Sequence, residues 1–401
     1  MNCRTHTHTR GTMQRLIPIL LLLLIIWPAA PTDAQDALVG PLIAVDTAEQ
    51  DRILLYDLSN MSSRELRFGP RWHRVWGFSA DGCRVLLTLS DGRALGRLYS
   101  ARIDGTDLRE LVQFYELPAN RWGIWDAHWS PDGSRIAFTM IRDEPQPTGQ
   151  IEREYHVGWV EAGGGAPQFY SVSGDEHEPA WSPDGQWLAY IAYEERVAGA
   201  DMQSTAVPTP EGGPELPLLR EADLWVTSAD GSIKYRLTNF PVGSVRAPRW
   251  SPDGFLIGFT YSPSPSNDQF WMIANQEGSI PTQLSGQWSL ILDTTWLPDS
   301  SAMISAVRDF QGTRENRLWR IPLVGLADTD AVPFLVNDAL NFTDYPRFSP
   351  DGRWLAFRSA YRLALVSTAD LTGQVLDAGT YGNTPPVWSP PGFAGEAACA
   401  G

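Results

Sequence analysis

Trp129-Ser-Pro-Asp-Gly133 is the stretch that decides the fold of this 401-residue chain. The same five residues recur as Trp181-Ser-Pro-Asp-Gly185 and Trp250-Ser-Pro-Asp-Gly254. Four variants complete the set: Phe78-Ser-Ala-Asp-Gly82, Trp296-Leu-Pro-Asp-Ser300, Phe348-Ser-Pro-Asp-Gly352 and Trp388-Ser-Pro-Pro-Gly392. We call this five-residue unit the phrase. Its copies are separated by 40 to 69 residues. That spacing is typical of four-stranded propeller blades and not of helical solenoids.

Each phrase is expected to form a hairpin turn. Ser, Pro and Gly stand where a type I turn that continues into a left-handed Gly prefers them. An aromatic residue ends the strand before the turn, and an alternating apolar run such as 135–139 begins the strand after it. Third strands at 223–227, 269–273 and 317–321, each with a short fourth strand, complete a unit of four.

The two ends of the chain complete the count of blades. Residues 41–45, 52–56 and 64–68 supply three strands with no first strand before them, and the last phrase supplies a first strand alone. We therefore predict an all-β fold, a seven-bladed β-propeller of four-stranded antiparallel blades whose closing blade is shared by both termini. Residues 35–401 are expected to form this single domain, with a short C-terminal tail. Closure removes the open sheet edges of a linear array.

The phrase and the Ile-Ala-Phe-like strand after it resemble the TolB-type, WD-repeat-like β-propeller family. The resemblance extends over nearly the whole chain after residue 34 and implies the propeller fold. TolB proteins are known for six blades and an additional amino-terminal domain that engages other envelope proteins. This chain has seven phrases and no room for that domain, so no TolB binding residue is carried over.

Residues 1–34 have the order of a secretory signal peptide. Arg4, Arg10 and Arg15 precede an apolar run over 16–27, and small and polar residues follow it. A retained anchor is the alternative, although the run is shorter than the roughly 20 residues that span a bilayer. We predict an extracytoplasmic protein that is periplasmic, bound to the cell envelope or secreted.

The charge excludes several classes of partner. The chain has 31 Lys and Arg against 47 Asp and Glu, a net charge of -16, and Lys234 is its single lysine. Nucleic-acid binding requires clustered basic residues, so no nucleic acid is expected as a partner. We also expect no membrane insertion of the mature domain and a monomeric state.

Two cysteines remain after the predicted signal peptide, Cys83 and Cys399. Cys83 follows the first phrase, and Cys399 lies in the tail beyond the last one, so both are expected on the same face. The sequence predicts a disulfide between them in an oxidising compartment, with two free thiols as the alternative.

Candidate binding residues gather at the starts of the first strands, on the face opposite the phrase turns. They are Trp125, Asp126, His177, Glu178, Arg246, Asp293 and Asp344, which would converge at the mouth of the central channel. A solvated rim is the alternative. Two long loops, 142–153 and 193–222, are predicted to open on the same face, where binding residues are favoured. Asp126, Glu178 and Asp293 could also supply a carboxylate pair for glycoside chemistry.

Other polar patterns are interpreted as structural. The Asp of each phrase can bond nearby backbone amides, and the aromatic residue is expected to pack between blades. His73, His128 and His177 stand at different offsets from the phrase, so no metal site is expected. The chain lacks the familiar hydrolase and nucleotide-binding motifs, and no catalytic residue or cofactor is assigned.

We therefore predict a non-enzymatic scaffold for protein–protein recognition through the long-loop face and the channel mouth, with a protein partner. The alternatives are a carbohydrate-active hydrolase or lyase and a propeller that binds a small ligand or a cation.

Overall fold

The computed structural model describes residues 37–69, 71–91, 96–113, 121–170, 175–197, 218–264, 267–285, 290–308, 316–325, 331–335, 340, 342–376, 381–382 and 384–399. The predicted signal peptide, residues 1–34, and residues 198–217 of the second predicted loop lie outside these ranges. Within them, strands predominate, and one 3-10 helix, η1 (Glu396–Cys399), ends the described chain. None of the helices described has the length and apolar character needed to cross a membrane.

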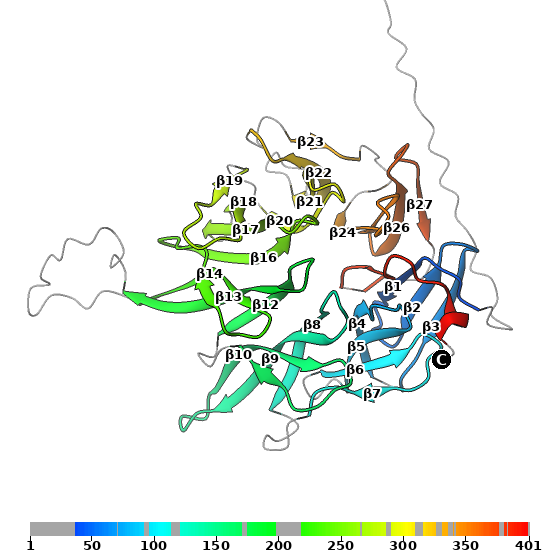
Figure 1. The fold of residues 1–401 in the computed structure, drawn as a ribbon, viewed down its shortest axis with the longest axis horizontal. Coiled ribbons are helices and arrows are strands. Elements are labelled where there is room, and N and C mark those ends of the chain that lie inside the picture. The colour runs from blue at the N-terminus through cyan, green and yellow to red at the C-terminus, as the bar shows by residue number, and fades with distance from the viewer. Residues whose placement is uncertain are drawn as a thin grey trace, which may run out of the picture.

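Short sheets surround a common centre, and the chain passes through them in order (Figure 1). The first strands are β4 (Trp72–Phe78), β8 (Trp122–Trp129), β12 (Glu176–Trp181), β16 (Ser244–Trp250), β20 (Leu290–Trp296), β24 (Thr343–Phe348) and β28 (Val387–Trp388). The second strands are β5 (Arg84–Ser90), β9 (Arg135–Pro145), β13 (Trp187–Val197), β17 (Leu256–Ser264), β21 (Ala302–Arg308), β25 (Trp354–Ser359) and β1 (Leu42–Asp46).

The third strands are β6 (Arg97–Arg102), β10 (Ile151–Glu161), β14 (Leu218–Ser228), β18 (Asn267–Ala274), β22 (Asn316–Pro322), β26 (Arg362–Ser367) and β2 (Ile53–Asp57). The fourth are β7 (Arg109–Glu110), β11 (Gln168–Phe169), β15 (Lys234–Arg236), β19 (Thr282–Gln283), β23 (Val332–Pro333), β27 (Gly373–Leu376) and β3 (Ser62–Leu66). Apolar side chains on the two faces of each sheet pack against the adjacent sheets. Leu86 and Leu98, for example, share a buried cluster with Ile136 and Phe138.

The prediction of seven separate blades is wrong. The structure has five four-stranded antiparallel blades, and the remaining strands form one eight-stranded sheet in the order β12-β13-β14-β16-β17-β18-β19, with β15 on β14. The sheet is continuous because β14 and β16 pair in parallel through Ala222 and Ser244. This pairing depends on how far β14 extends, which the spacing of the phrases does not reveal.

The phrase forms the turn that its residues predict. In the third copy, the Ser182 hydroxyl donates to Asp184 Oδ1 at 2.5 Å, and the same oxygen accepts the N–H of Gln186 at 3.0 Å. Gly185 has a φ of 69°, in the left-handed region that favours glycine. Four other copies repeat the Ser–Asp bond at 2.5 to 2.6 Å. The structural interpretation of the phrase Asp is confirmed.

The phrase Trp links neighbouring first strands. The indole Nε1 of Trp250 donates to the carbonyl of Ala180 at 2.9 Å, and that of Trp296 donates to the carbonyl of Arg249 at 2.9 Å. Trp181 and Trp388 make the same bond, at 3.2 and 3.1 Å. In every case the acceptor is the residue immediately before a phrase. The predicted packing role of the aromatic residue is therefore confirmed, and a hydrogen bond accompanies it.

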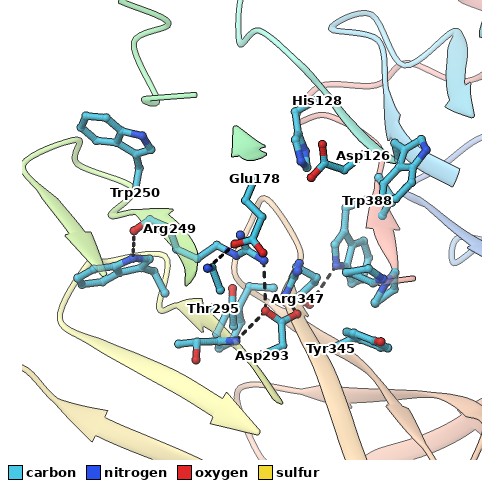
Figure 2. Close-up of a pocket in the computed structure, with 18 of the residues that line it drawn as sticks. Asp126, His128, Glu178, Arg249, Trp250, Asp293, Thr295, Tyr345, Arg347 and Trp388 are labelled. Carbon is cyan, nitrogen blue, oxygen red and sulfur yellow. Dashed lines mark hydrogen bonds and ion pairs between the residues drawn. The ribbon is translucent and has the colours of Figure 1, made fainter. Parts of the chain in front are cut away.

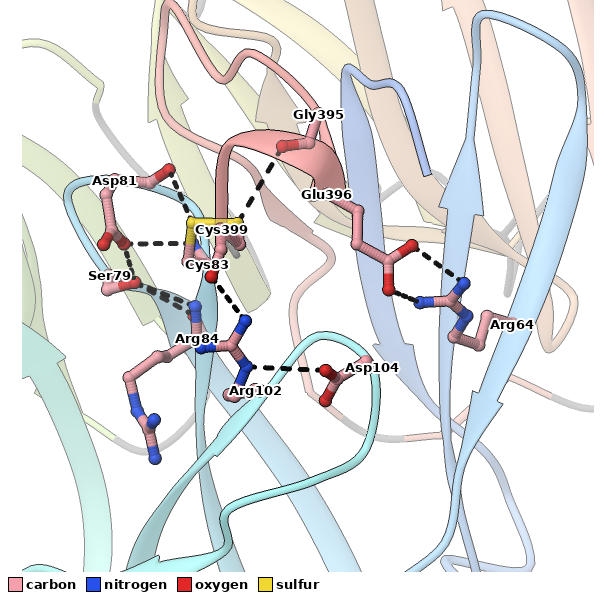
Figure 3. Close-up of a disulfide and its surroundings, with 10 residues drawn as sticks. All are labelled: Arg64, Ser79, Asp81, Cys83, Arg84, Arg102, Asp104, Gly395, Glu396 and Cys399. Atoms are coloured by element: carbon pink, nitrogen blue, oxygen red, sulfur yellow. Dashed lines mark hydrogen bonds and ion pairs between the residues drawn. A yellow bond between two sulfur atoms is a disulfide. The ribbon is translucent and has the colours of Figure 1, made fainter. Parts of the chain in front are cut away.

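The two ends of the chain meet in one sheet. β28 pairs with β1 through Ile43 with Trp388 and Ala44 with Val387, which gives the order β28-β1-β2-β3. Beyond β28, the tail bonds back to the first sheets, and Figure 3 shows how η1 is held. Cys83 and Cys399 form a disulfide, and Glu396 binds Arg64 with two hydrogen bonds of 2.6 and 2.9 Å.

Candidate functional site

A cavity of about 830 Å³ occupies the centre of the ring of first strands. Its lining comes from the first strands and the phrases after them. Two positions relative to the phrase aromatic recur: the third residue before it and the residue immediately before it. The third residues are Val75, Asp126, Glu178, Ala247, Asp293, Tyr345 and Pro385, and His128, Arg249, Thr295, Arg347 and Val387 immediately precede a phrase. Both sets face the channel because alternate residues of a strand share a side.

Bulges in the first strands shape this wall. In β12, β16 and β24 the pairing register shifts across Glu178, Ala247 and Tyr345, respectively. These three residues have φ values of 58°, 54° and 55°, a left-handed conformation that costs energy in a residue other than glycine. All three are third residues before a phrase, so each bulge re-aims a side chain at the channel, as bulges beside functional sites do.

Two arginines converge on one buried carboxylate in the wall (Figure 2). Arg249 Nη2 lies 3.3 Å from Asp293 Oδ1, and Arg347 Nη1 lies 2.8 Å from Asp293 Oδ2. Each guanidinium also donates to the carbonyl of the proline before it, Pro248 at 3.0 Å and Pro346 at 2.7 Å. Asp293 is only 6% exposed. The three side chains therefore form a fixed, locally cationic cluster.

Two carboxylates stand on the neighbouring part of the wall. Asp126 Oδ1 accepts the N–H of Thr139 at 3.0 Å, and burial, with a smaller contribution from the charge of Glu178, raises the pKa of Asp126 to about 6. Burial also raises the pKa of Glu178, but hydrogen bonds and the charge of His177 outweigh it, so the net pKa is lowered. Glu178 Oε2 accepts the N–H of Ala247 at 2.5 Å, which fixes its carboxylate.

His128, two residues after Asp126 on β8, is neutral at physiological pH. Burial, together with the positive charges of Arg249 and Arg347, lowers the pKa of His128 to about 4. Its imidazole has no hydrogen-bond partner among the described residues, so both ring nitrogens remain available to a ligand.

The structure brings five of the seven predicted binding residues to the cavity: Trp125, Asp126, Glu178, Arg246 and Asp293. Their role in binding remains a prediction. Trp125 is 51% exposed, and Arg246 is bound to Asp268.

The other two predicted residues are outside the lining. His177 contacts the rings of Tyr155 and Tyr193, whose centroids lie 6.2 and 5.3 Å from its own. Asp344 makes two hydrogen bonds with Arg358, of 2.7 and 2.6 Å.

Sequence reasoning missed the residues immediately before the phrases, His128, Arg249 and Arg347 above all. It also placed the site too far from the phrases, because Pro252, Pro298 and Pro350 of the turns line the cavity. The period of two along each strand was the signal that could have found the missing residues. In the part of the chain that the structure describes, no three His, Cys, Asp or Glu residues are grouped so that they could hold a metal ion.

Comparison with known proteins finds similar proteins but no family to which the chain can be assigned. No protein-family model matches the chain. It is 25% identical over 236 residues to the uncharacterized peptidase YuxL of Bacillus subtilis, which covers 58% of this chain and 29% of that one. It is 26% identical over 149 residues to the Tol-Pal system protein TolB of Desulfosudis oleivorans, which covers 34% and 27%. The chain thus spans less than a third of the length of either relative.

Solved structures share the propeller fold. A puromycin hydrolase mutant has a TM-score of 0.59 at 13% identity, over 89% of this chain and 56% of that one. An oligogalacturonate lyase in complex with manganese has a TM-score of 0.53 at 15% identity, over 83% and 93%. At these identities the likeness shows the fold alone, which serves enzymes and binding proteins alike.

Proposed function

We propose that this protein is a non-enzymatic, extracytoplasmic scaffold that holds a protein partner on two projecting hairpins beside the channel. The hairpins are β9–β10 and β13–β14, whose strands have 11 residues each, against 5 to 9 in the other second and third strands. Figure 1 shows both extending outward from the ring. We call residues 141–156 with Tyr193 the hairpin surface. The predicted loops 142–153 and 193–222 are thus largely strand where they are described.

The observation that carries the proposal is the aromatic cluster that joins the two hairpins. Tyr155 of the first hairpin contacts His177 edge to face, and Tyr193 of the second contacts the same ring at a tilt, with interplanar angles of 63° and 33°. Within the first hairpin, Arg153 makes two hydrogen bonds with Asp143, of 2.7 and 3.0 Å. A surface fixed in advance loses little conformational entropy when it binds, which favours affinity for a partner.

The tip of the first hairpin presents one exposed apolar side chain among polar ones. Ile151 is 67% exposed, and the Gln146 side chain donates to Glu152 beside it at 2.7 Å. A partner that covers the tip would bury Ile151, which favours binding.

Three observations support an extracytoplasmic location. The Cys83–Cys399 disulfide requires an oxidising compartment in most organisms, and residues 1–34 have the order of a signal peptide. The likeness to a Tol-Pal system protein agrees with a place in the cell envelope. Fractionation of source cells tests this directly, since the mature chain in the cytoplasmic fraction would contradict it.

The partner is tested with purified protein and matched surface variants. Candidates captured from source-cell envelope extract are purified and titrated against the wild type, Ile151→Asp and Tyr155→Ala by biolayer interferometry. Phe255→Asp is the control, because Phe255 is 73% exposed directly after a phrase and away from the hairpins. We expect both hairpin variants to bind at least about tenfold more weakly, and the control to bind as the wild type does.

Two results would refute the proposal. One is a direct partner whose affinity is the same for Ile151→Asp, Tyr155→Ala and the wild type. The other is turnover of a glycan panel by the wild type that Asp126→Asn abolishes, which would establish the carbohydrate-active alternative instead.

A further inference from the structure

We infer that the channel cavity binds a short linear peptide with a free amino end, a free carboxyl end and apolar side chains. The inference goes beyond the proposed function and does not rest on it, because the cavity and the hairpin surface are composed of different residues. It comes from the order in which charged and apolar groups follow one another around the wall.

The cavity wall has three chemically distinct sides. Arg249 and Arg347, with Asp293 between them, form its basic side, and Asp126 with Glu178 forms its acidic side. Between β24, which carries Arg347, and β8, which carries Asp126, the ring passes through β28 and β4. The residues there are Val75, Trp76, Pro385, Pro386 and Val387, which form the apolar side.

The basic side has unused donors. A guanidinium carries five N–H groups, and the contacts of these two arginines employ Nη1 and Nη2 of Arg249 and Nη1 of Arg347. The Nε atoms of both and Nη2 of Arg347 have no hydrogen-bond partner among the described residues. Two cations share the single carboxylate of Asp293, so a ligand carboxylate would complete both the charge balance and the hydrogen bonds.

The acidic side supplies the opposite charge. Asp126 and Glu178 come from adjacent first strands, β8 and β12, and each is fixed by a backbone N–H, from Thr139 and Ala247 respectively. A carboxylate accepts at several lone pairs, so each retains capacity for a second donor. An ammonium group placed here would relieve the repulsion between the two carboxylates.

The balance of the wall favours a zwitterion over a simple ion. Arg246 is already paired with Asp268, so the wall offers two arginines, Arg249 and Arg347 around Asp293, and two carboxylates, Asp126 and Glu178, on the adjacent strands β8 and β12. Charge complementarity therefore favours a ligand that carries one charge of each sign, one at each end. His128, neutral and without a partner, can donate to and accept from a peptide group between those ends.

The volume of the cavity suits a peptide of a few residues. Small-molecule sites span about 300–1,000 Å³, a range that includes this cavity of about 830 Å³. An extended chain advances about 3.5 Å per residue, so a tripeptide separates its termini by about 10 Å. Side chains along it would meet the apolar side, where their burial adds affinity.

The test compares three peptides, each in four forms. Leu-Ala-Leu, Phe-Ala-Val and Ala-Ala-Ala, each with free ends, N-acetylated, C-amidated or blocked at both ends, are titrated by calorimetry into the mature protein. We expect the free peptides with large side chains to bind at least about tenfold more tightly than their singly blocked forms, because each block removes one charge contact. Arg347→Gln should abolish the preference for carboxylate over amide and leave the preference for free amine. Asp126→Asn should do the reverse.

A matched variant and a folding check separate recognition from damage. Arg353→Gln makes the same chemical change at a side chain that is 80% exposed after a phrase, and it should bind all forms as the wild type does. Thermal unfolding confirms that each variant is folded. Three results would each overturn the inference. They are equal affinity for free and doubly blocked peptides, no binding of any form at millimolar concentration, and an Arg347→Gln variant that loses the same affinity for the free acid as for the amide. Ile151→Asp should leave peptide binding unchanged, so failure here is distinguishable from failure of the hairpin surface.

Discussion

Removal of the Cys83–Cys399 disulfide should weaken the whole propeller, and not only its last residues. The bond joins residues 316 positions apart, and every described strand from β5 onward lies within the loop that it closes. In the chain-entropy treatment a loop of that length stabilises by about 5 to 6 kcal/mol, an upper figure, while measured losses cluster at about 2–5 kcal/mol. The pairing of β28 with β1 is limited to two residue pairs, and the rest of the closure consists of single hydrogen bonds, such as that from Leu42 N–H to Ser389 Oγ, and of packing between β1 and β26.

The perturbation is the double substitution Cys83→Ser and Cys399→Ser, which leaves no free thiol. The tail would retain the Arg64–Glu396 ion pair and the bond from Arg102 to the Cys399 carbonyl. We therefore expect the free energy of unfolding to fall by about 3 to 5 kcal/mol, with an unchanged denaturant slope.

Guanidinium unfolding followed by tryptophan fluorescence measures this loss. The reduced wild type should match the double variant. A loss below about 1 kcal/mol would refute the reasoning, because it would mean that the tail detaches locally and that the strand pairs alone close the ring.

Three further variants test the energetics of the wall. Asp126→Asn should stabilise the protein by about 3 kcal/mol at pH 8 and have little effect at pH 4. The pKa of Asp126 is about 6 in the folded state and 3.8 in the unfolded state, so the charged carboxylate destabilises the fold as the pH rises through 6. His128→Gln should stabilise by about 2 kcal/mol at pH 5 and not at pH 8, because the unfolded imidazole takes up a proton near pH 6.5 and the folded one only near 4. Trp250→Phe should cost about 1–2 kcal/mol, because the Ala180 carbonyl loses its indole donor. Urea unfolding at each pH measures all three, and the opposite pH dependence of the first two makes them controls for each other.

The phrase carries most of what the sequence reveals about the fold. Its Ser, Asp and Gly define the turn through contacts within five residues, so turn, strand order and the meeting of the two ends can be predicted locally. The separation into blades cannot, because it depends on a single parallel pair, Ala222 with Ser244, between segments that each belong to a different hairpin. The sequence contains no local signal for that contact.

The site was predictable in part for a similar reason. Asp126, Glu178 and Asp293 are polar residues at strand positions fixed relative to the phrase, so their convergence follows from the repeat. His177 could not be placed, because its partners Tyr155 and Tyr193 belong to hairpins whose extension beyond the ring is set by tertiary contacts. Arg249 and Arg347 share the period of the predicted residues, but they lie at the ends of β16 and β24, beside the phrases, and not at the strand starts where the channel mouth was expected.

The sheet that contains both ends of the chain has a consequence for synthesis. β1 is among the first described strands to be made, and its partner β28 is the last, so the edge of β1 that β28 covers stays unpaired until residue 388 is available. A chain that is still being made or transported therefore cannot close its ring. Any truncation before β28 leaves β1, whose five residues are buried and apolar except for Asp46, open to pairing with other chains. Only a chain that extends through β28 can therefore cover this edge of β1.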